Sequence, residues 1–231
     1  EKKHLYGWIK TDSLLEIESG KPGILSYRAK WENQNKEVLL EERTRFEFSG
    51  NNHKRIIDRV TTLTASQDVL FKDAKDGLLG LRLAQELQIP TRETQKFKDD
   101  KGNETIVKVG EGQVANGNYR SSEGKTGDDV WSTRAAWCMA YGKMNNDSVS
   151  VAIIDHPQNP NYPTYWHTRG YGLFAANPLG ENIFTNGKLS KNLHLQKGQS
   201  VTFKYRLIID ENKHTLSKSE LDKEAKKFAK K

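Results

Sequence analysis

Cysteine and long apolar runs are the scarcest features of this 231-residue sequence. Cys138 is the single cysteine, which excludes an intramolecular disulfide and a metal site built from several cysteines. It lies in the apolar run RAAWCMAYG, which predicts a buried and unreactive thiol. No run approaches the ~18 apolar residues that a membrane helix needs, and the mean hydropathy is −0.81. We therefore expect no membrane span.

Excess positive charge is modest and is concentrated at one end of the chain. The formal net charge is +7, and six lysines between Lys218 and Lys231 stand among three acidic residues there. The remaining excess is spread thinly, unlike the concentrated basic stripe of a nucleic-acid-binding surface. This pattern predicts a solvated surface with a basic tail and no nucleic-acid partner.

Strand patterns dominate the rest of the sequence. Apolar and polar side chains alternate almost without fault over residues 201–209, and shorter runs at 25–31, 38–48 and 149–154 behave similarly. Alternation with one polar face is typical of antiparallel sheets that are covered on one side. The sequence therefore predicts an all-β protein, a large antiparallel β-sandwich with long loops, as a single domain over residues 1–231.

A short basic helix is expected at residues 216–231, after a sandwich at 1–215. Leu221, Ala225 and Phe228 fall at helical spacing, and Ser219 with Asp222 resembles a capping box. The segment GLRLAQELQ is predicted to be a strand. So is TIVKVG, with DDKGNE as the turn before it.

The segment IIDHPQNPNYPTYWHTRGYGLFAANPLG, residues 153–180, gathers four of the six prolines and two of the six histidines. Prolines fix φ and restrict the preceding residue, so this loop loses little entropy when it binds a ligand. It follows a predicted strand end, where rigid scaffolds often place working side chains. In an extended segment Tyr165, His167 and Arg169 share one face.

Aromatic rings beside charged and amide groups are typical of a carbohydrate site, because rings stack on sugars and polar groups bind hydroxyls. We predict that the loop forms such a site with the turns DAKD and EGK. His156, His167 and Arg134 are the candidate catalytic residues, since imidazole transfers protons near neutral pH and guanidinium holds oxygen atoms. The candidate ligand-binding residues are Asp73, Lys75, Asp76, Glu123, Lys125, Trp131, Asp155, Asn159, Trp166, Arg169 and Tyr171.

Other interpretations of these residues stay open. Asp155, His156 and His167 would supply three metal ligands, but their spacing matches no recurring zinc pattern, so we expect no metal and no cofactor. The GKT at 124–126 is not a phosphate loop, because Tyr119 stands where the first glycine is required. DAKD also reads as a charged turn. Trp131, which is placed on one strand face with Trp137, could also be a core residue. The whole loop could also be a structural element.

Five segments resemble the PmoA-family domain, a bacterial family of unknown function nominally called methane oxygenase. They are LLEERTRFEF, DAKDGLLGLRLA, SSEGKTGDDVWSTRAAW, DHPQNPNYPTYWHTRGYGLFAANPLG and GQSVTFKYRLIID. The resemblance implies a sandwich similar to that of sugar mutarotases, a place in bacterial glycan utilisation, and export to the periplasm or beyond. Family members carry an earlier His-His-Arg-Gly-like motif that is not found here, so an N-terminal part is expected to be missing.

The sequence therefore predicts a carbohydrate-processing or carbohydrate-binding β-sandwich protein with its site on the His156–Arg169 loop. Its partner would be a carbohydrate or another polar small molecule. The alternatives are a non-catalytic glycan-binding module and a protein-interaction module with a structural proline-rich loop. Catalysis itself, the sugar and the oligomeric state are left open.

Overall fold

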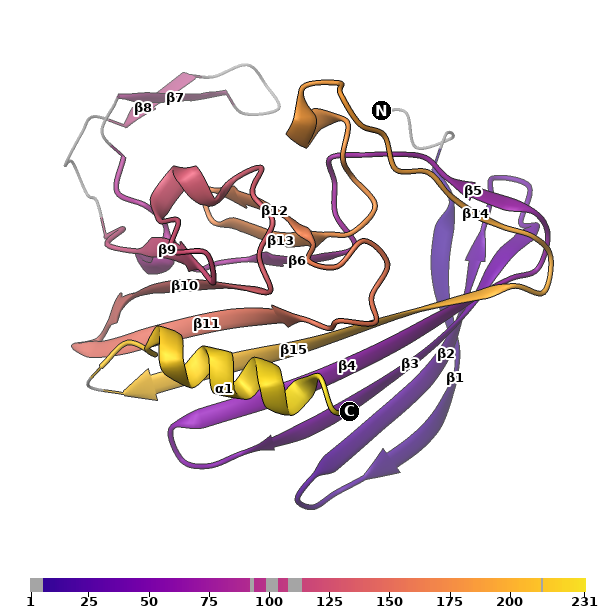
Figure 1. Ribbon diagram of the computed structural model, residues 1–231, viewed down its shortest axis with the longest axis horizontal. Coiled ribbons are helices and arrows are strands. Elements are labelled where there is room, and N and C mark those ends of the chain that lie inside the picture. Colours follow the sequence, from indigo (N-terminus) through magenta and orange to yellow (C-terminus); the bar gives the residue numbers. More distant parts are fainter. Residues whose placement is uncertain (1–5, 92–93, 99–103, 108–113, 213) are drawn as a thin grey trace.

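A large antiparallel sheet forms the centre of the molecule. The computed structural model describes residues 6–91, 94–98, 104–107, 114–212 and 214–231. Over these ranges eight strands pair in the order β1-β2-β3-β4-β15-β11-β10-β9 (Figure 1). Their bounds are β1 Trp8–Glu18, β2 Gly23–Glu32, β3 Val38–Gly50, β4 Lys54–Ala65, β9 Asn118–Ser121, β10 Trp137–Met144, β11 Asp147–Asp155 and β15 Ser200–Asn212.

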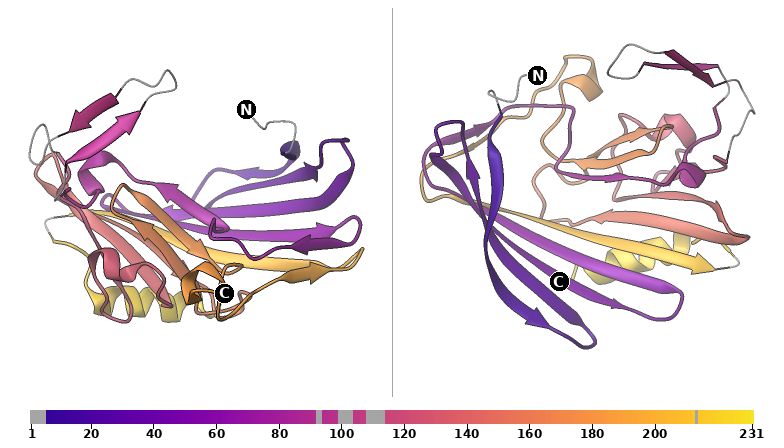
Figure 2. Two further views of the ribbon diagram at one scale, coloured as in Figure 1. Left: turned by 90° about the horizontal axis from the view of Figure 1, so that it is seen from above. Right: turned by 180° about the vertical axis from the view of Figure 1, so that it is seen from behind.

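Smaller elements cover both faces of this sheet (Figures 1 and 2). We call the face under the sheet β12-β13-β6 the inner face, and the face under helix α1 the outer face. The described residues also form the pairs β5–β14 and β7–β8. The bounds are β5 Val69–Phe71, β6 Leu79–Arg82, β7 Gln95–Lys98, β8 Glu104–Val107, β12 Tyr165–Arg169, β13 Leu173–Asn177, β14 Leu193–Leu195, α1 Lys218–Phe228, and the 3-10 helices η2 Gln85–Leu87, η3 Gly127–Val130 and η4 Ile183–Thr185. The predicted all-β sandwich with a short C-terminal helix is confirmed.

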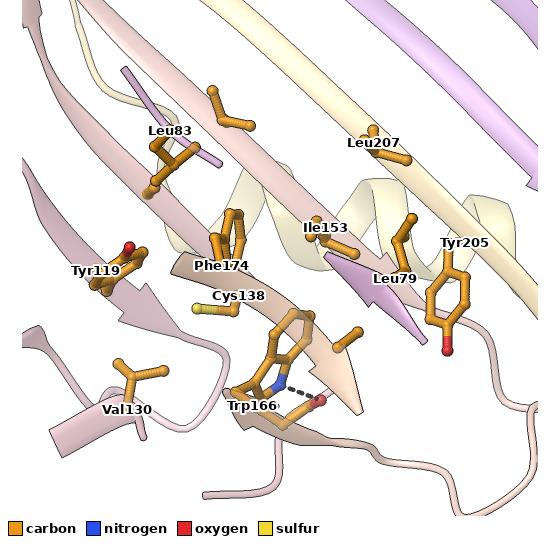
Figure 3. Packing of buried hydrophobic residues seen from close by; sticks show 14 of the residues in the cluster. Leu79, Leu83, Tyr119, Val130, Cys138, Ile153, Trp166, Phe174, Tyr205 and Leu207 are labelled. Carbon is orange, nitrogen blue, oxygen red and sulfur yellow. Dashed lines mark hydrogen bonds between the residues drawn. The ribbon is translucent and has the colours of Figure 1, made fainter. Parts of the chain in front are cut away.

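The inner face carries the larger apolar core. Trp166 of β12 and Phe174 of β13 are fully buried against the large sheet, where they share one cluster with Cys138 and Ile153 (Figure 3). Trp166 also donates its indole N–H to the Ala135 carbonyl at 3.0 Å. Burying each such side chain stabilises the fold by roughly 1.5–3 kcal/mol. The buried Cys138 thiol has its pKa raised by desolvation, consistent with an unreactive residue.

The helix α1 covers the outer face. Leu221 and Phe228 are buried there, as the helical spacing predicts. The capping box is formed by Ser217 and Glu220, so the prediction of Ser219 with Asp222 was wrong. Asp222 instead accepts a hydrogen bond from the Trp137 indole at 2.8 Å.

Charged groups fasten α1 to the sheet. Arg206 of β15 donates to both carboxylate oxygens of Asp58 at 2.6 and 2.8 Å and to Glu224 of the helix at 2.9 Å. Its guanidinium also lies over the Phe228 ring. Burial alone would raise the pKa of Asp58, but Arg206 and Lys231 outweigh it and lower that pKa. Because Arg206 and Asp58 are both buried, their mutual pairing is what makes the burial tolerable.

Several local predictions need correction. GLRLAQELQ is a strand only to Arg82, after which the chain forms η2. Trp131 directly follows η3 and Trp137 begins β10, so the two indoles do not share a strand. The predicted strand TIVKVG is described only as β8, and the turn before it lies largely outside the described residues. None of the helices in the described ranges is long and apolar enough to cross a membrane.

Candidate functional site

A pocket of about 230 Å³ lies on the inner face, beside Leu78, the residue that precedes β6. It occupies the part of the large sheet formed by β1–β4 and β15. Its lining combines aromatic, aliphatic and charged side chains: Ile9, Tyr27, Trp31, Glu42, Arg59, Thr61, Leu63, Leu78, Phe203 and Tyr205. Nearby, Leu14 of β1 is 61% exposed, so this part of the inner face is open rather than covered like the core.

Glu42 is a carboxylate on the inner side of β3, between two buried residues. Leu40 and Thr44 precede and follow it on the same face, and Glu42 itself is only 4% exposed. Tyr27 and Thr44 donate to its Oε1 at 2.8 and 2.7 Å, and Trp31 Nε1 donates to its Oε2 at 2.8 Å. Three donors for one carboxylate are what the burial of a charge requires.

The hydrogen bonds decide the protonation state of Glu42. Burial works to raise its pKa, but the three donors and the nearby Arg59 outweigh burial and lower the pKa below its usual value. Burial and the bond to Glu42 raise the pKa of Tyr27. The site therefore holds an ionised carboxylate beside a neutral phenol at neutral pH.

Arg59 and Tyr205 are directly opposite each other on the paired strands β4 and β15. Arg59 Nη2 lies 3.9 Å from Glu42 Oε1, which is an ion pair without a hydrogen bond. Arg59 Nε and Tyr205 Oη are both buried and have no hydrogen-bond partner in the part of the chain that the structure describes. The pocket thus contains polar groups that the protein itself leaves unsatisfied.

This arrangement fits a ligand with hydroxyl groups and an apolar face. The half-buried rings of Tyr27 and Trp31 offer aromatic surface. Glu42 keeps one free acceptor position on Oε2, since a carboxylate has about four. Glu42 is the one acidic group among the lining residues, so the described pocket lacks the paired carboxylates of a glycoside hydrolase.

The proline-rich loop makes internal contacts. Asp155 accepts hydrogen bonds from the Thr164 amide, from the His156 amide and from Asn159 Nδ2. Asn159 in turn pairs with the backbone of Lys204 through its amide nitrogen and oxygen. These contacts fasten the loop to β15. Asp155 is 2% exposed, and burial raises its pKa to about 6 despite the three donors.

The two candidate catalytic histidines lie on opposite sides of the large sheet. The His156 ring packs edge-on against Phe228 of α1 on the outer side, with ring centroids 5.0 Å apart. His167 belongs to β12 on the inner side, where its Nδ1 lies 2.8 Å from the Lys75 carbonyl oxygen. Burial is the main cause that lowers the pKa of both imidazoles. The expected convergence of both histidines in one site is therefore not found.

Arg134 also supports the loop. It donates to the carbonyls of Pro163 and Asn161 and lies over the Tyr165 ring at 5.1 Å. Trp166 is a core residue, and Arg169 stacks on Trp131 at 4.4 Å. The remaining candidates Glu123, Lys125 and Tyr171 are exposed. None of these residues lines the pocket on the inner face, and their part in ligand binding stays a prediction.

The turn DAKD borders a second surface depression. A shallow depression of about 500 Å³ is lined by Asp73 and Lys75 together with neighbours from 182–192, whereas Asp76 is exposed beside it. The Asp73 carboxylate accepts hydrogen bonds from the amides of Glu181, Asn182 and Lys191. Asp73 therefore organises the 181–191 turn, in line with the structural interpretation of this motif.

Glu42, Arg59 and Tyr205 were not predicted as site residues. A usable signal was present for Glu42, because it interrupts the apolar side of the alternating run 38–48. No local pattern marked Arg59 or Tyr205, since both obtain their roles from strand pairing. Among the described residues no group of three or more His, Cys, Asp or Glu side chains is arranged to hold a metal ion.

The fold and the pocket define an all-β sandwich protein with a polar pocket on the open part of its inner face. The chain belongs to DUF6807, a family of unknown function, whose model matches residues 1–226. The resemblance to the PmoA-family domain was therefore wrong. No curated protein sequence matches the chain.

Two solved structures are similar to the chain at low identity. A protein assigned as a kojibiose phosphorylase, from the human microbiome, shares 10% identity at a TM-score of 0.42; the match covers 96% of this chain and 23% of that one. A galactose mutarotase related enzyme from Lactobacillus acidophilus shares 9% identity at a TM-score of 0.33, with 90% and 72% covered. The chain thus spans about a quarter of the length of the first.

Proposed function

We propose that this protein binds a carbohydrate in the pocket on the inner face. The observation that carries the proposal is Glu42, a buried and ionised carboxylate whose donors include the Trp31 indole inside an open pocket. A carboxylate of this kind accepts hydrogen bonds from sugar hydroxyls, while the aromatic rings contact the apolar face of a sugar.

Binding is favoured over hydrolysis. Three of the four acceptor positions of Glu42 are occupied, and its lowered pKa makes it a poor proton donor. No second acidic group lines the described pocket. The proline-rich loop is a positioning element in this proposal, because its polar side chains are used to fasten it.

Titration calorimetry with a panel of mono- and disaccharides tests the proposal. We expect wild type to bind at least one sugar, and Glu42→Gln to weaken that affinity by about 10-fold or more, since a hydrogen bond to a charged group contributes roughly 1.5–3 kcal/mol. Trp31→Phe keeps an aromatic ring and removes the donor to Glu42, so it serves as a second variant. Glu41→Gln is the matched control, because Glu41 is exposed on the other face of the same strand. The proposal fails if no sugar binds, or if Glu42→Gln binds as wild type does.

A further inference from the structure

Two hydrogen-bond donors in the pocket have no partner among the residues that the structure describes. Arg59 Nε and Tyr205 Oη are buried, line the same pocket and belong to residues paired directly across β4 and β15. An unpaired buried donor is costly, and in native structures such a group calls for an explanation such as a bound water, an ion or a functional role. A ligand that reaches the pocket floor would meet two neighbouring donors, one of them on a cation.

Glu42 does not satisfy these donors. Its oxygens are engaged by Tyr27, Thr44 and Trp31, and it approaches Arg59 only to 3.9 Å at Nη2. Arg59 is paired with Tyr205 of β15 on one side and with Phe46 of β3 on the other, and these three residues form one row across the sheet. Phe46 lies four residues along β3 from Glu42. At about 3.4 Å per residue, this separates the two backbone positions by roughly 14 Å, a distance that the Arg59 and Glu42 side chains span to bring Nη2 within 3.9 Å of Glu42 Oε1. Glu42 therefore pairs with the charge of Arg59 through Nη2, but it leaves Arg59 Nε and the Tyr205 hydroxyl without an acceptor among the described residues.

Asp155 is another acidic residue beside this row. It is paired with Tyr205 on the neighbouring strand β11. Its carboxylate is engaged by Thr164, His156 and Asn159, and Asp155 is not among the lining residues. It leaves the Arg59 and Tyr205 donors unsatisfied.

We infer that the ligand of this pocket carries a carboxylate, as an acidic sugar does, and that Arg59 and Tyr205 bind it. This inference rests on the carbohydrate-binding function proposed above. A carboxylate has two oxygens that accept side by side, and its hydrogen bonds to guanidinium and phenol groups are stronger than those of a neutral hydroxyl.

Paired sugars that differ only in the acid group test this inference. Calorimetry would compare D-glucuronate with D-glucose, and D-galacturonate with D-galactose, at one ionic strength. We expect one acid to bind at least about 10-fold more tightly than its neutral partner. We expect Arg59→Gln and Tyr205→Phe each to bring this affinity ratio close to 1, and Glu41→Gln to leave it unchanged.

The Tyr205→Phe variant also has a readout in the free protein. Because the Tyr205 hydroxyl has no partner, its removal should not lower the melting temperature, so a changed ratio would not reflect unfolding. If acid and neutral sugars bind equally to wild type, or if both variants keep the wild-type ratio, the acidic ligand is excluded while carbohydrate binding stands. If no sugar of either kind binds, the proposed function itself is overturned.

Discussion

The Trp31 indole donates its N–H to the Glu42 carboxylate at 2.8 Å, between the neighbouring strands β2 and β3. Trp31 is paired with Leu40, and Glu42 with Ala29, so the bond runs diagonally between adjacent rungs of the sheet. It joins the largest aromatic surface of the pocket to its single lining carboxylate. This contact depends on the alternation of side chains along each strand, which places both side chains on the inner face, and on the register between β2 and β3.

Glu42→Ala should destabilise the protein. The change leaves the donors of Tyr27, Thr44 and Trp31 without their acceptor, and we expect a loss of about 2–4 kcal/mol in the free energy of unfolding. Urea denaturation followed by fluorescence measures it. Glu41→Ala, at an exposed position on the same strand, should stay within about 0.5 kcal/mol of wild type. Equal effects of the two substitutions would contradict the network.

Asp155 should make stability depend on pH between about 4 and 6. Burial raises its folded-state pKa to about 6 from an ordinary value of 3.8. Between these values the folded protein holds a proton that the unfolded chain releases, so the contribution is present at low pH and is lost as pH rises through 6. We expect the difference in unfolding free energy between wild type and Asp155→Asn to fall across this window and to level off above it.

Urea unfolding of both proteins at intervals from pH 4 to 7 gives this difference directly. Since other titrating groups are common to the two proteins, their effects cancel in the comparison. A difference that rises with pH over this window would show that the Asp155 pKa is lowered in the folded protein.

Replacing either histidine should affect stability more than ligand affinity. His156 packs on Phe228, and His167 binds the Lys75 carbonyl, so neither side chain lines the pocket. We expect His156→Ala and His167→Ala to lower the melting temperature but to change sugar affinity by less than roughly twofold, because the sites are separate. Calorimetry well below the melting temperature checks this. A 10-fold loss of affinity in His167→Ala would return the ligand site to the proline-rich loop.

Arg206→Ala should remove a charged link between α1 and the sheet. Removing one partner of a buried ion pair leaves Asp58 with only the partly exposed Lys231 as a cationic partner among the described residues, at a cost of about 3–5 kcal/mol. Urea denaturation is again the measurement. Arg55→Ala, an exposed arginine on β4, is the control and should have little effect. If both variants lose less than 1 kcal/mol, Arg206 is not a structural link.

The large sheet could be predicted because alternation is a local property. The run 201–209 shows its apolar side in the sequence, and the structure places Phe203 and Tyr205 on the inner face. The exact start of α1 was harder, since Ser217 and Ser219 are both plausible caps and local spacing does not distinguish them. The predicted capping box required the Asp222 carboxylate, which instead accepts the hydrogen bond from the Trp137 indole.

The candidate site was predicted from the many polar, titratable and aromatic residues in one loop. This criterion cannot distinguish a loop that binds a ligand from a loop whose polar groups bond to one another. Asp155, Asn159 and Arg134 are polar and titratable, yet in the structure they satisfy backbone groups of the loop and of β15. His156 and His167 are close in sequence, but the intervening loop carries the chain from one side of the sheet to the other. Their closeness in sequence therefore led to the wrong expectation that the two histidines share one site.

By itself the sequence determined that the protein is built from antiparallel sheet, that its cysteine is inert, and that a short amphipathic helix ends the described chain. These properties follow from periodicity and composition, which act over a few residues. Only the tertiary structure decided that Glu42, Arg59 and Tyr205, separated by up to 163 positions, meet in one pocket. That outcome depends on the register β3-β4-β15, because strand pairing and not the local sequence determines which side chains become neighbours.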